Sequence, residues 1–187
     1  MLKSFYLLRI MKTLIIAALE TFKDILTPIN CPKGELLLRE NKTSKALFLV
    51  KQGLLRSFYY KNGKDITAYF AIDYDIIGAA DSIIKNEKSI YNIEALEDST
   101  VYKLDYDRLE QFLDEHPKHE RLARRISQAL YMDLVERMEG MAFLTAKERY
   151  DHLLEKHPKL TQRVSLGHIA SYLSISQETL SRIRREK

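Results

Sequence analysis

The chain of 187 residues has one cysteine, Cys31, and no tryptophan. A single thiol excludes an intramolecular disulfide and a cysteine-based zinc or iron–sulfur site, and it is typical of a reducing compartment. The longest apolar run, Leu14–Leu19, is far shorter than the roughly 20 residues that a bilayer span requires. No small-x-small cleavage site follows this run, so a secretory signal is not expected. These absences predict a cytoplasmic protein without a membrane segment.

Glycine and proline are also scarce, with 6 and 4 residues, and most of the glycines lie in the first 80 positions. Short runs rich in β-branched and aromatic residues lie among these glycines and predict strands: Leu47–Val50, Leu54–Tyr60, Ile66–Phe70, Ile90–Ile93 and Val101–Leu104. Asn62-Gly63 joins two of these runs and tolerates the positive φ angles of a type I′ turn, which predicts a hairpin. Because no βαβ alternation is present, residues 1–115 are expected to form an antiparallel β roll with flanking helices.

The period of the apolar residues changes after Tyr106. Pro117 suits the first turn of a helix, and an apolar stripe then follows in steps of four: Leu122, Ile126, Leu130, Leu134 and Met138. This pattern predicts a helix from about Lys118 to Met141, about 36 Å long. Pairing of two copies along the stripe would bury it, so residues 116–142 are expected to form a dimerisation helix. Packing of the helix on its own β domain is the alternative.

The excess of basic residues is concentrated near the C-terminal end, where positions 162–187 hold five basic and two acidic residues. Within residues 143–187, an apolar set with one small residue predicts two short helices that cross steeply over a tight turn: Ile169, Ala170, Leu173, Ile175, Leu180 and Ile183. This arrangement is a helix-turn-helix, and its second helix is the expected DNA reader.

The second helix of this motif carries a polar face with the residue types that read base edges: Gln177, Glu178, Ser181, Arg182 and Arg185. Arginine pairs with guanine, glutamine with adenine, and glutamate accepts from cytosine. Three hydroxyl residues at the expected helix N-termini are candidates for DNA phosphate contacts: Ser165, Ser176 and Thr179. A solvated basic helix end is the alternative interpretation of the same face.

The stretch from Arg163 to Lys187, RVSLGHIASYLSISQETLSRIRREK, resembles the helix-turn-helix of the Crp–Fnr transcription regulators. The family's recognition helix typically opens Ser-Arg-Glu-Thr and carries a later arginine. Ser176, Glu178, Thr179 and Arg182 match that pattern, and Gln177 replaces the first arginine. This replacement puts the family's usual half-site sequence in doubt. Ser174 also stands where many such turns have glycine.

Shorter segments resemble the family's cyclic-nucleotide-binding-type β roll: residues 33–35, 50–56 and 95–99. The resemblance implies an effector pocket, in which a cassette supplies Gly-Glu for the ribose and Arg-Ser or Arg-Thr for the cyclic phosphate. The matching positions are Gly78, Ala79, Ser89 and Ile90, so both the carboxylate and the arginine are missing. A buried phosphate without its arginine would lose a charge-assisted partner. We therefore expect no bound cyclic nucleotide. We also expect no haem, iron–sulfur cluster or metal.

The expected fold class is α+β: a jelly roll of the cyclic-nucleotide-binding type, a long dimerisation helix and a winged-helix-type helix-turn-helix. The expected function is that of a bacterial, homodimeric transcription regulator that binds double-stranded DNA. RNA polymerase and an unknown small-molecule effector are further candidate partners. No nucleophile elbow, P-loop, dinucleotide-binding turn or HExxH pattern is present, so no catalytic residue is assigned and no enzyme is expected. The alternative function is a regulatory module that contacts a protein through the roll and the last helix.

Overall fold

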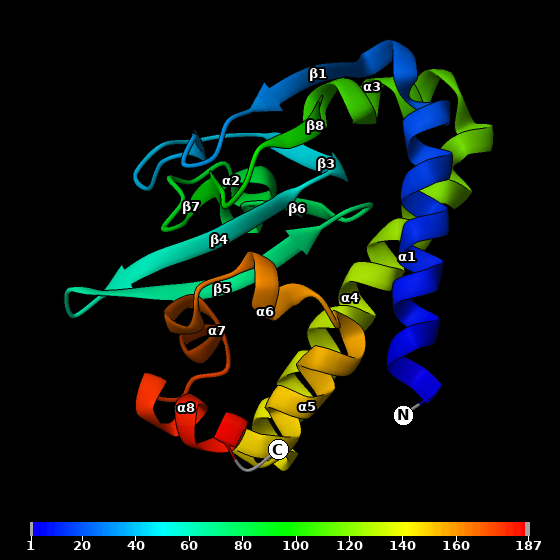
Figure 1. Cartoon of the computed structure of the whole chain (residues 1–187). Helices are drawn as coiled ribbons and strands as arrows, with labels where there is room; N and C mark the ends of the chain where they lie inside the picture. The colour runs from blue at the N-terminus through cyan, green and yellow to red at the C-terminus, as the bar shows by residue number, and fades with distance from the viewer. Residues whose placement is uncertain (1, 186–187) are drawn as a thin grey trace.

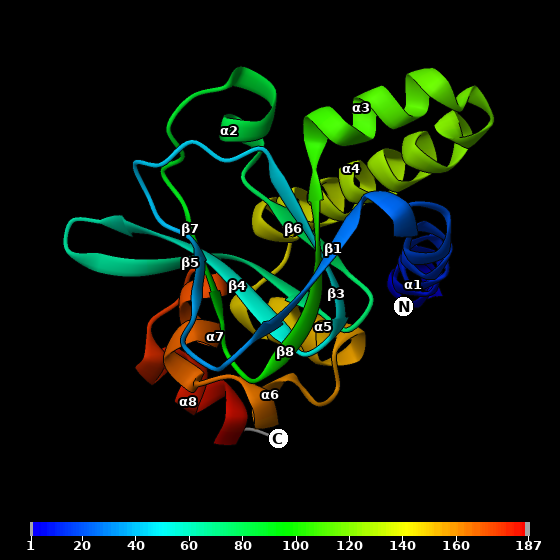
Figure 2. The ribbon, with the colours of Figure 1, turned by 90° about the horizontal axis from the view of Figure 1, so that it is seen from above.

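The computed structural model describes residues 2–185, with side chains from residue 7 onward (Figure 1). Two antiparallel sheets form a β roll, with the N-terminal helix to one side of it and the C-terminal helices below it (Figures 1 and 2). The strands are β1 (Leu26–Cys31), β2 (Leu36–Leu38), β3 (Ala46–Gln52), β4 (Leu54–Lys61), β5 (Lys64–Ile72), β6 (Ile76–Gly78), β7 (Asn92–Ala95) and β8 (Ser99–Asp105). The α-helices are α1 (Leu2–Thr21), α2 (Ala80–Lys85), α3 (Tyr106–Glu115), α4 (Glu120–Phe143), α5 (Ala146–Lys156), α6 (Leu160–Arg163), α7 (Leu166–Tyr172) and α8 (Gln177–Arg185). Short 3₁₀ turns, η1 (Lys23–Ile25) and η2 (Pro117–His119), precede β1 and α4.

The roll consists of one sheet in the order β1-β8-β3-β6 and a second in the order β2-β7-β4-β5. The predicted hairpin is β4–β5, in which Lys61 pairs with Lys64. Asn62 and Gly63 between them have φ angles of 52° and 72°, as a type I′ turn requires. The predicted antiparallel roll with flanking helices is therefore confirmed.

Three strands were not predicted, and one begins later than expected. Strand β1 contains Pro28, which lacks an N–H donor and usually indicates a turn. It is tolerated because β1 is an edge strand. Strands β2 and β6 have 3 residues each, too few to show an alternating pattern. Ile90 was wrongly placed in a strand: it is 59% exposed, its N–H donates to Asp81, and β7 begins at Asn92.

Helix α1 packs beside the N-terminal half of α4, as both views show (Figures 1 and 2). The apolar run Leu14–Leu19 lies in α1, where Ile15 and Ala18 are buried in one cluster with Ile126 and Ala129 of α4. This contact buries part of the stripe within a single chain, as the alternative interpretation of α4 allowed. Among the helices of residues 2–185, none is both long and apolar enough to cross a membrane.

Helices α5 to α8 lie below the second sheet, with α7 against the edge strand β5 (Figure 1). Helix α5 begins at a capping box, in which Thr145 and Glu148 satisfy each other's backbone N–H groups. It ends before Pro158, because a residue that precedes proline disfavours the helical conformation. These helices carry the C-terminal motif beside the roll.

Candidate nucleic-acid interface

Helices α7 and α8 form the predicted helix-turn-helix. Ser165 caps α7 by accepting a hydrogen bond from the His168 N–H at 3.2 Å, and Ser176 accepts from the Thr179 N–H at 3.1 Å. Ser174 in the turn has a φ of 55°, a left-handed conformation that explains why glycine is common at this position. Ile169 and Leu180 are both fully buried between the two helices and the roll.

The opposite face of α8 is open to solvent. Gln177, Glu178, Arg182 and Arg185 are exposed and Ser181 is half-buried, so all five predicted base-reading residues lie on the accessible side. A hydrogen bond with the Ser176 side chain lowers the pKa of Glu178, which keeps this carboxylate ionised in the first turn. The last turn carries Arg182, Arg184 and Arg185, so α8 presents an acidic start and a basic end.

The three predicted phosphate contacts lie at helix starts. Ser165 and Ser176 are exposed, and Thr179 is half-buried. The hydroxyl oxygens of Ser165 and Ser176 accept capping bonds from backbone N–H groups. Since a hydroxyl both donates and accepts, capping leaves the O–H of Ser165 available to a phosphate oxygen. The Ser176 and Thr179 hydroxyls lie 3.1 Å apart and share one hydrogen bond.

The predicted stripe of α4 divides into two parts. Leu122, Ile126 and Leu130 belong to the apolar cluster that α1 covers. Leu134 and Met138 are 54% and 63% exposed. An interface along α4 in this conformation is therefore restricted to its C-terminal half.

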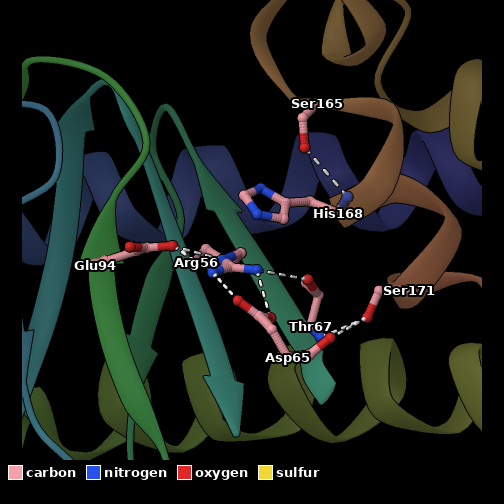
Figure 3. Close-up of polar contacts among 7 residues, drawn as sticks. All are labelled: Arg56, Asp65, Thr67, Glu94, Ser165, His168 and Ser171. Atoms are coloured by element: carbon pink, nitrogen blue, oxygen red, sulfur yellow. Dashed lines mark hydrogen bonds and ion pairs between the residues drawn. The ribbon is translucent and has the colours of Figure 1, made fainter. Parts of the chain in front are cut away.

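A buried charged cluster lies beneath α7, and it was not predicted (Figure 3). Arg56 of β4 is 2% exposed and donates to both Asp65 oxygens at 2.7 and 2.8 Å. It also donates to Glu94 at 2.7 Å and to the Thr67 hydroxyl at 3.1 Å. An arginine between Leu54, Leu55 and Phe58 in a strand was the available signal, because a charge on a buried strand face requires partners.

Ser171 of α7 bonds to the two β5 residues of this cluster, Asp65 and Thr67 (Figure 3). Its hydroxyl accepts from the Thr67 N–H at 2.9 Å and donates to the Asp65 carbonyl at 3.2 Å. Since β5 is an edge strand, this side chain supplies hydrogen-bond partners that a neighbouring strand would otherwise supply. The helix-turn-helix is thus fixed to the roll by side-chain bonds as well as by apolar packing.

Comparisons with known proteins agree with this architecture. Residues 28–116 match the family model of the cyclic nucleotide-binding domain. The transcriptional activator protein FnrA of Stutzerimonas stutzeri is 27% identical over 164 residues, which cover 81% of this chain and 66% of that protein. The transcriptional activator protein anr of Pseudomonas aeruginosa is 24% identical over 163 residues, with the same coverage. The chain thus matches just under two thirds of the length of these relatives.

Solved structures of related regulators share the fold over most of the chain. The c-di-GMP-responsive global regulator CLP of Xanthomonas campestris has a TM-score of 0.70 at 16% identity, covering 91% of this chain and 90% of that one. FixK2 from Bradyrhizobium japonicum has a TM-score of 0.71 at 20% identity, covering 87% of this chain and 84% of that one. The chain is therefore similar in fold to these regulators, and in sequence to transcriptional activators of the Fnr type.

A cavity of about 370 Å³ lies between the roll and α4, and residues of β3, β4, β5, β6, α2, α3 and α4 line it. Gly78 lies on its wall, but Ala79 and Ser89 are buried elsewhere and the exposed Ile90 lies outside it. Of the four predicted effector positions, only Gly78 therefore lines this cavity. The wall is mainly apolar, and Arg137 of α4 is its one basic residue among those described. Within residues 2–185, no cluster of three or more His, Cys, Asp or Glu side chains could hold a metal ion.

The docked helix-turn-helix should lose stability in mild acid through His168. Burial lowers the pKa of His168, and the nearby Arg56 lowers it further, against the opposing carboxylates of Asp65 and Glu94. Since the pKa is about 6.5 in an unfolded chain, the unfolded state takes up more protons below that value. The stability contribution of His168 is complete above pH 6.5 and is lost as the pH falls toward the folded pKa.

We expect wild type to lose stability relative to His168→Gln as the pH falls from about 7.5 to 5, measured by urea denaturation at each pH. The control is His116→Gln, which removes an exposed histidine from outside the interface between the helix-turn-helix and the roll. A constant difference between wild type and His168→Gln would contradict the assignment.

Proposed function

We propose that this protein is a sequence-specific transcription regulator of the Crp–Fnr type that binds double-stranded DNA, and is not an enzyme. The observation that carries the proposal is the exposed polar face of α8, whose apolar face is buried in the helix-turn-helix core. A short helix held in this way fits the major groove, where arginine, glutamine and glutamate distinguish base pairs. This activity requires a cytoplasmic protein with access to the chromosome.

The acting species is a homodimer formed through the C-terminal half of α4. Tyr131, Leu134, Met138 and Met141 are each more than 40% exposed, and their spacing of three and four residues places them along one side of the helix. A contiguous apolar stripe of this kind is typical of a protein interface. Two-fold symmetry would present the two α8 helices to half-sites about 34 Å apart.

Cyclic nucleotides are not the effector in this proposal. The cavity has no carboxylate or arginine from the roll that could hold the ribose and the cyclic phosphate. Isothermal titration with cyclic AMP and cyclic GMP is expected to give no micromolar binding, and such binding to either would contradict this part of the proposal.

The decisive experiment is selection of random duplex DNA by the purified protein, followed by sequencing of the retained fraction. A two-fold symmetric motif is the expected result. Affinity for the selected site should fall steeply as salt rises, since phosphate contacts release counterions. Recovery of unspecific sequences only, with little salt dependence, would favour the alternative of a protein-binding module.

Arg182→Ala should weaken binding to the selected site by about 1–3 kcal/mol and relax the preference at one base position. Arg184→Ala is the matched control, because it removes the same charge two residues away, on another side of α8. We expect the control to lower the affinity for all DNA sequences alike and to preserve the base preference. Both effects are measured by competition binding with base-substituted sites. Equal behaviour of the two variants would contradict the assignment of Arg182 as a base reader.

A further inference from the structure

The helix-turn-helix does not close its apolar core by itself. Leu54 and Phe70 of the roll, 0% and 5% exposed, belong to the same cluster as Ile169 and Leu180. The rings of Phe70 and Tyr172 pack with their centroids 5.1 Å apart. The roll therefore forms one wall of the core that carries the recognition helix.

A polar clamp lies at the end of α6, immediately before the helix-turn-helix. Arg163 donates to the two oxygens of Glu97 at 2.6 and 3.1 Å, to Asp73 at 3.0 Å and to the Gly53 carbonyl at 2.8 Å. All three partners are in turns of the roll. Because the Arg163 guanidinium has one bidentate carboxylate and two further acceptors, both its orientation and its position on the roll are fixed.

A second polar attachment lies at the last turn of α7, where Ser171 bonds to the backbone of Asp65 and Thr67 (Figure 3). Arg163 lies before α7 and Ser171 lies in its last turn, and the apolar contact with Phe70 belongs to the same interface. Three separate contacts on one short unit leave it little freedom to rotate against the roll.

The docked position leaves the DNA-reading face free. Gln177, Glu178, Arg182 and Arg185 are exposed on α8. The hydrogen bonds with the roll come instead from Ser171 of α7 and from Arg163. Docking therefore fixes where the recognition helix points without covering the residues that would touch bases.

We infer that Arg163 and Ser171 are positioning residues that fix each helix-turn-helix on its own roll and thereby set which half-site spacing the dimer accepts. The inference rests on the proposed function, because spacing has meaning only for a dimer on two half-sites. In a dimer joined through α4, a rigid attachment of each helix-turn-helix to its roll fixes the position of its recognition helix relative to the dimer axis. Loss of the clamp would leave base contacts intact but make the separation between the two helices variable.

The test compares wild type with Arg163→Ala, Glu97→Gln and the double variant. Three sets of DNA are used: the selected site, an isolated half-site, and sites with one or two base pairs added or removed between the half-sites. Lys159→Ala is the matched control, because it removes a positive charge at the start of α6 from an exposed side chain. Thermal unfolding verifies that each variant is folded. Glu97 lies on the roll with its side chain 34% exposed, so its conservative variant is expected to fold.

We expect the clamp variants to bind the selected site about tenfold more weakly and the half-site within about twofold of wild type. Their preference for the selected spacing should fall, and the double variant should resemble Arg163→Ala, since removal of Arg163 already removes its contact with Glu97. Lys159→Ala should keep the spacing preference of wild type.

An unchanged spacing preference in folded clamp variants would overturn the inference. Tighter binding by these variants would also overturn it, because the clamp would then restrain a helix-turn-helix that must be released. Equal losses on half-site and full site would mean that Arg163 supports the fold or touches DNA directly. Failure of the proposed function has a different signature, since wild type itself would select no symmetric site.

Discussion

Arg56→Met is expected to lower the free energy of unfolding by about 3–5 kcal/mol. The substitution keeps an unbranched apolar stem but leaves Asp65 and Glu94 without their shared cation. Asp65 has a side chain that is 36% exposed and can be rehydrated, so Glu94, at 19%, accounts for most of the loss. Removal of one partner from a buried ion cluster costs more than the cluster contributes, because an uncompensated charge remains. Urea denaturation at neutral pH measures the change.

The matched control is Lys64→Met, which removes a positive charge from an exposed position of the same hairpin. Its effect should stay within about 0.5 kcal/mol. Adding Glu94→Met to Arg56→Met should restore part of the loss, since the remaining buried charge is then removed as well. A loss below about 1 kcal/mol for Arg56→Met would mean that the cluster is hydrated and not a buried ion network.

The same substitution should disturb the recognition unit. The Asp65 carboxylate is held by Arg56, and its carbonyl accepts from Ser171 of α7. Thr67 accepts from Arg56 through its hydroxyl and donates its N–H to Ser171. Loss of Arg56 therefore loosens both strand residues on which α7 rests.

Features that depend on neighbouring residues were predictable from the sequence. Asn62-Gly63 predicts its hairpin because both residues tolerate positive φ. The steps between Ile169, Leu180 and Ile183 predict the helix-turn-helix because the burial period is local. The sharp end of α5 follows from Pro158 alone.

Features that depend on distant residues were not predictable in the same way. Arg163 is separated from Glu97 by 66 positions and from Gly53 by 110. In sequence it was only one of several basic residues near the C-terminal end. The surroundings of the predicted effector positions likewise depend on distant residues: Ser89 is buried and Ile90 is exposed, and neither lines the cavity. The covering of α4 by α1 was also missed, since an amphipathic stripe does not specify its partner.

Leu134→Glu is expected to raise the dimer dissociation constant by at least about 100-fold. Leu134 lies in the exposed stripe of α4 between Tyr131 and Met138. In a two-fold interface each substitution occurs twice, so two carboxylates would enter one apolar contact. Because Leu134 is 54% exposed in the single chain, the fold itself should tolerate the change. Analytical ultracentrifugation over a concentration series measures the dissociation constant.

DNA binding by Leu134→Glu should fall to the affinity of an isolated half-site, a loss of about 10²–10⁴ on the full site. Gln128→Glu is the matched control: it adds the same charge to an exposed position of α4, about 120° around the helix from Leu134. The control should remain dimeric with wild-type affinity. If Leu134→Glu stays dimeric, the two copies do not meet at this half of α4. The N-terminal half would then be the remaining contact on this helix, and it becomes available only after α1 moves away from Ile126 and Ala129.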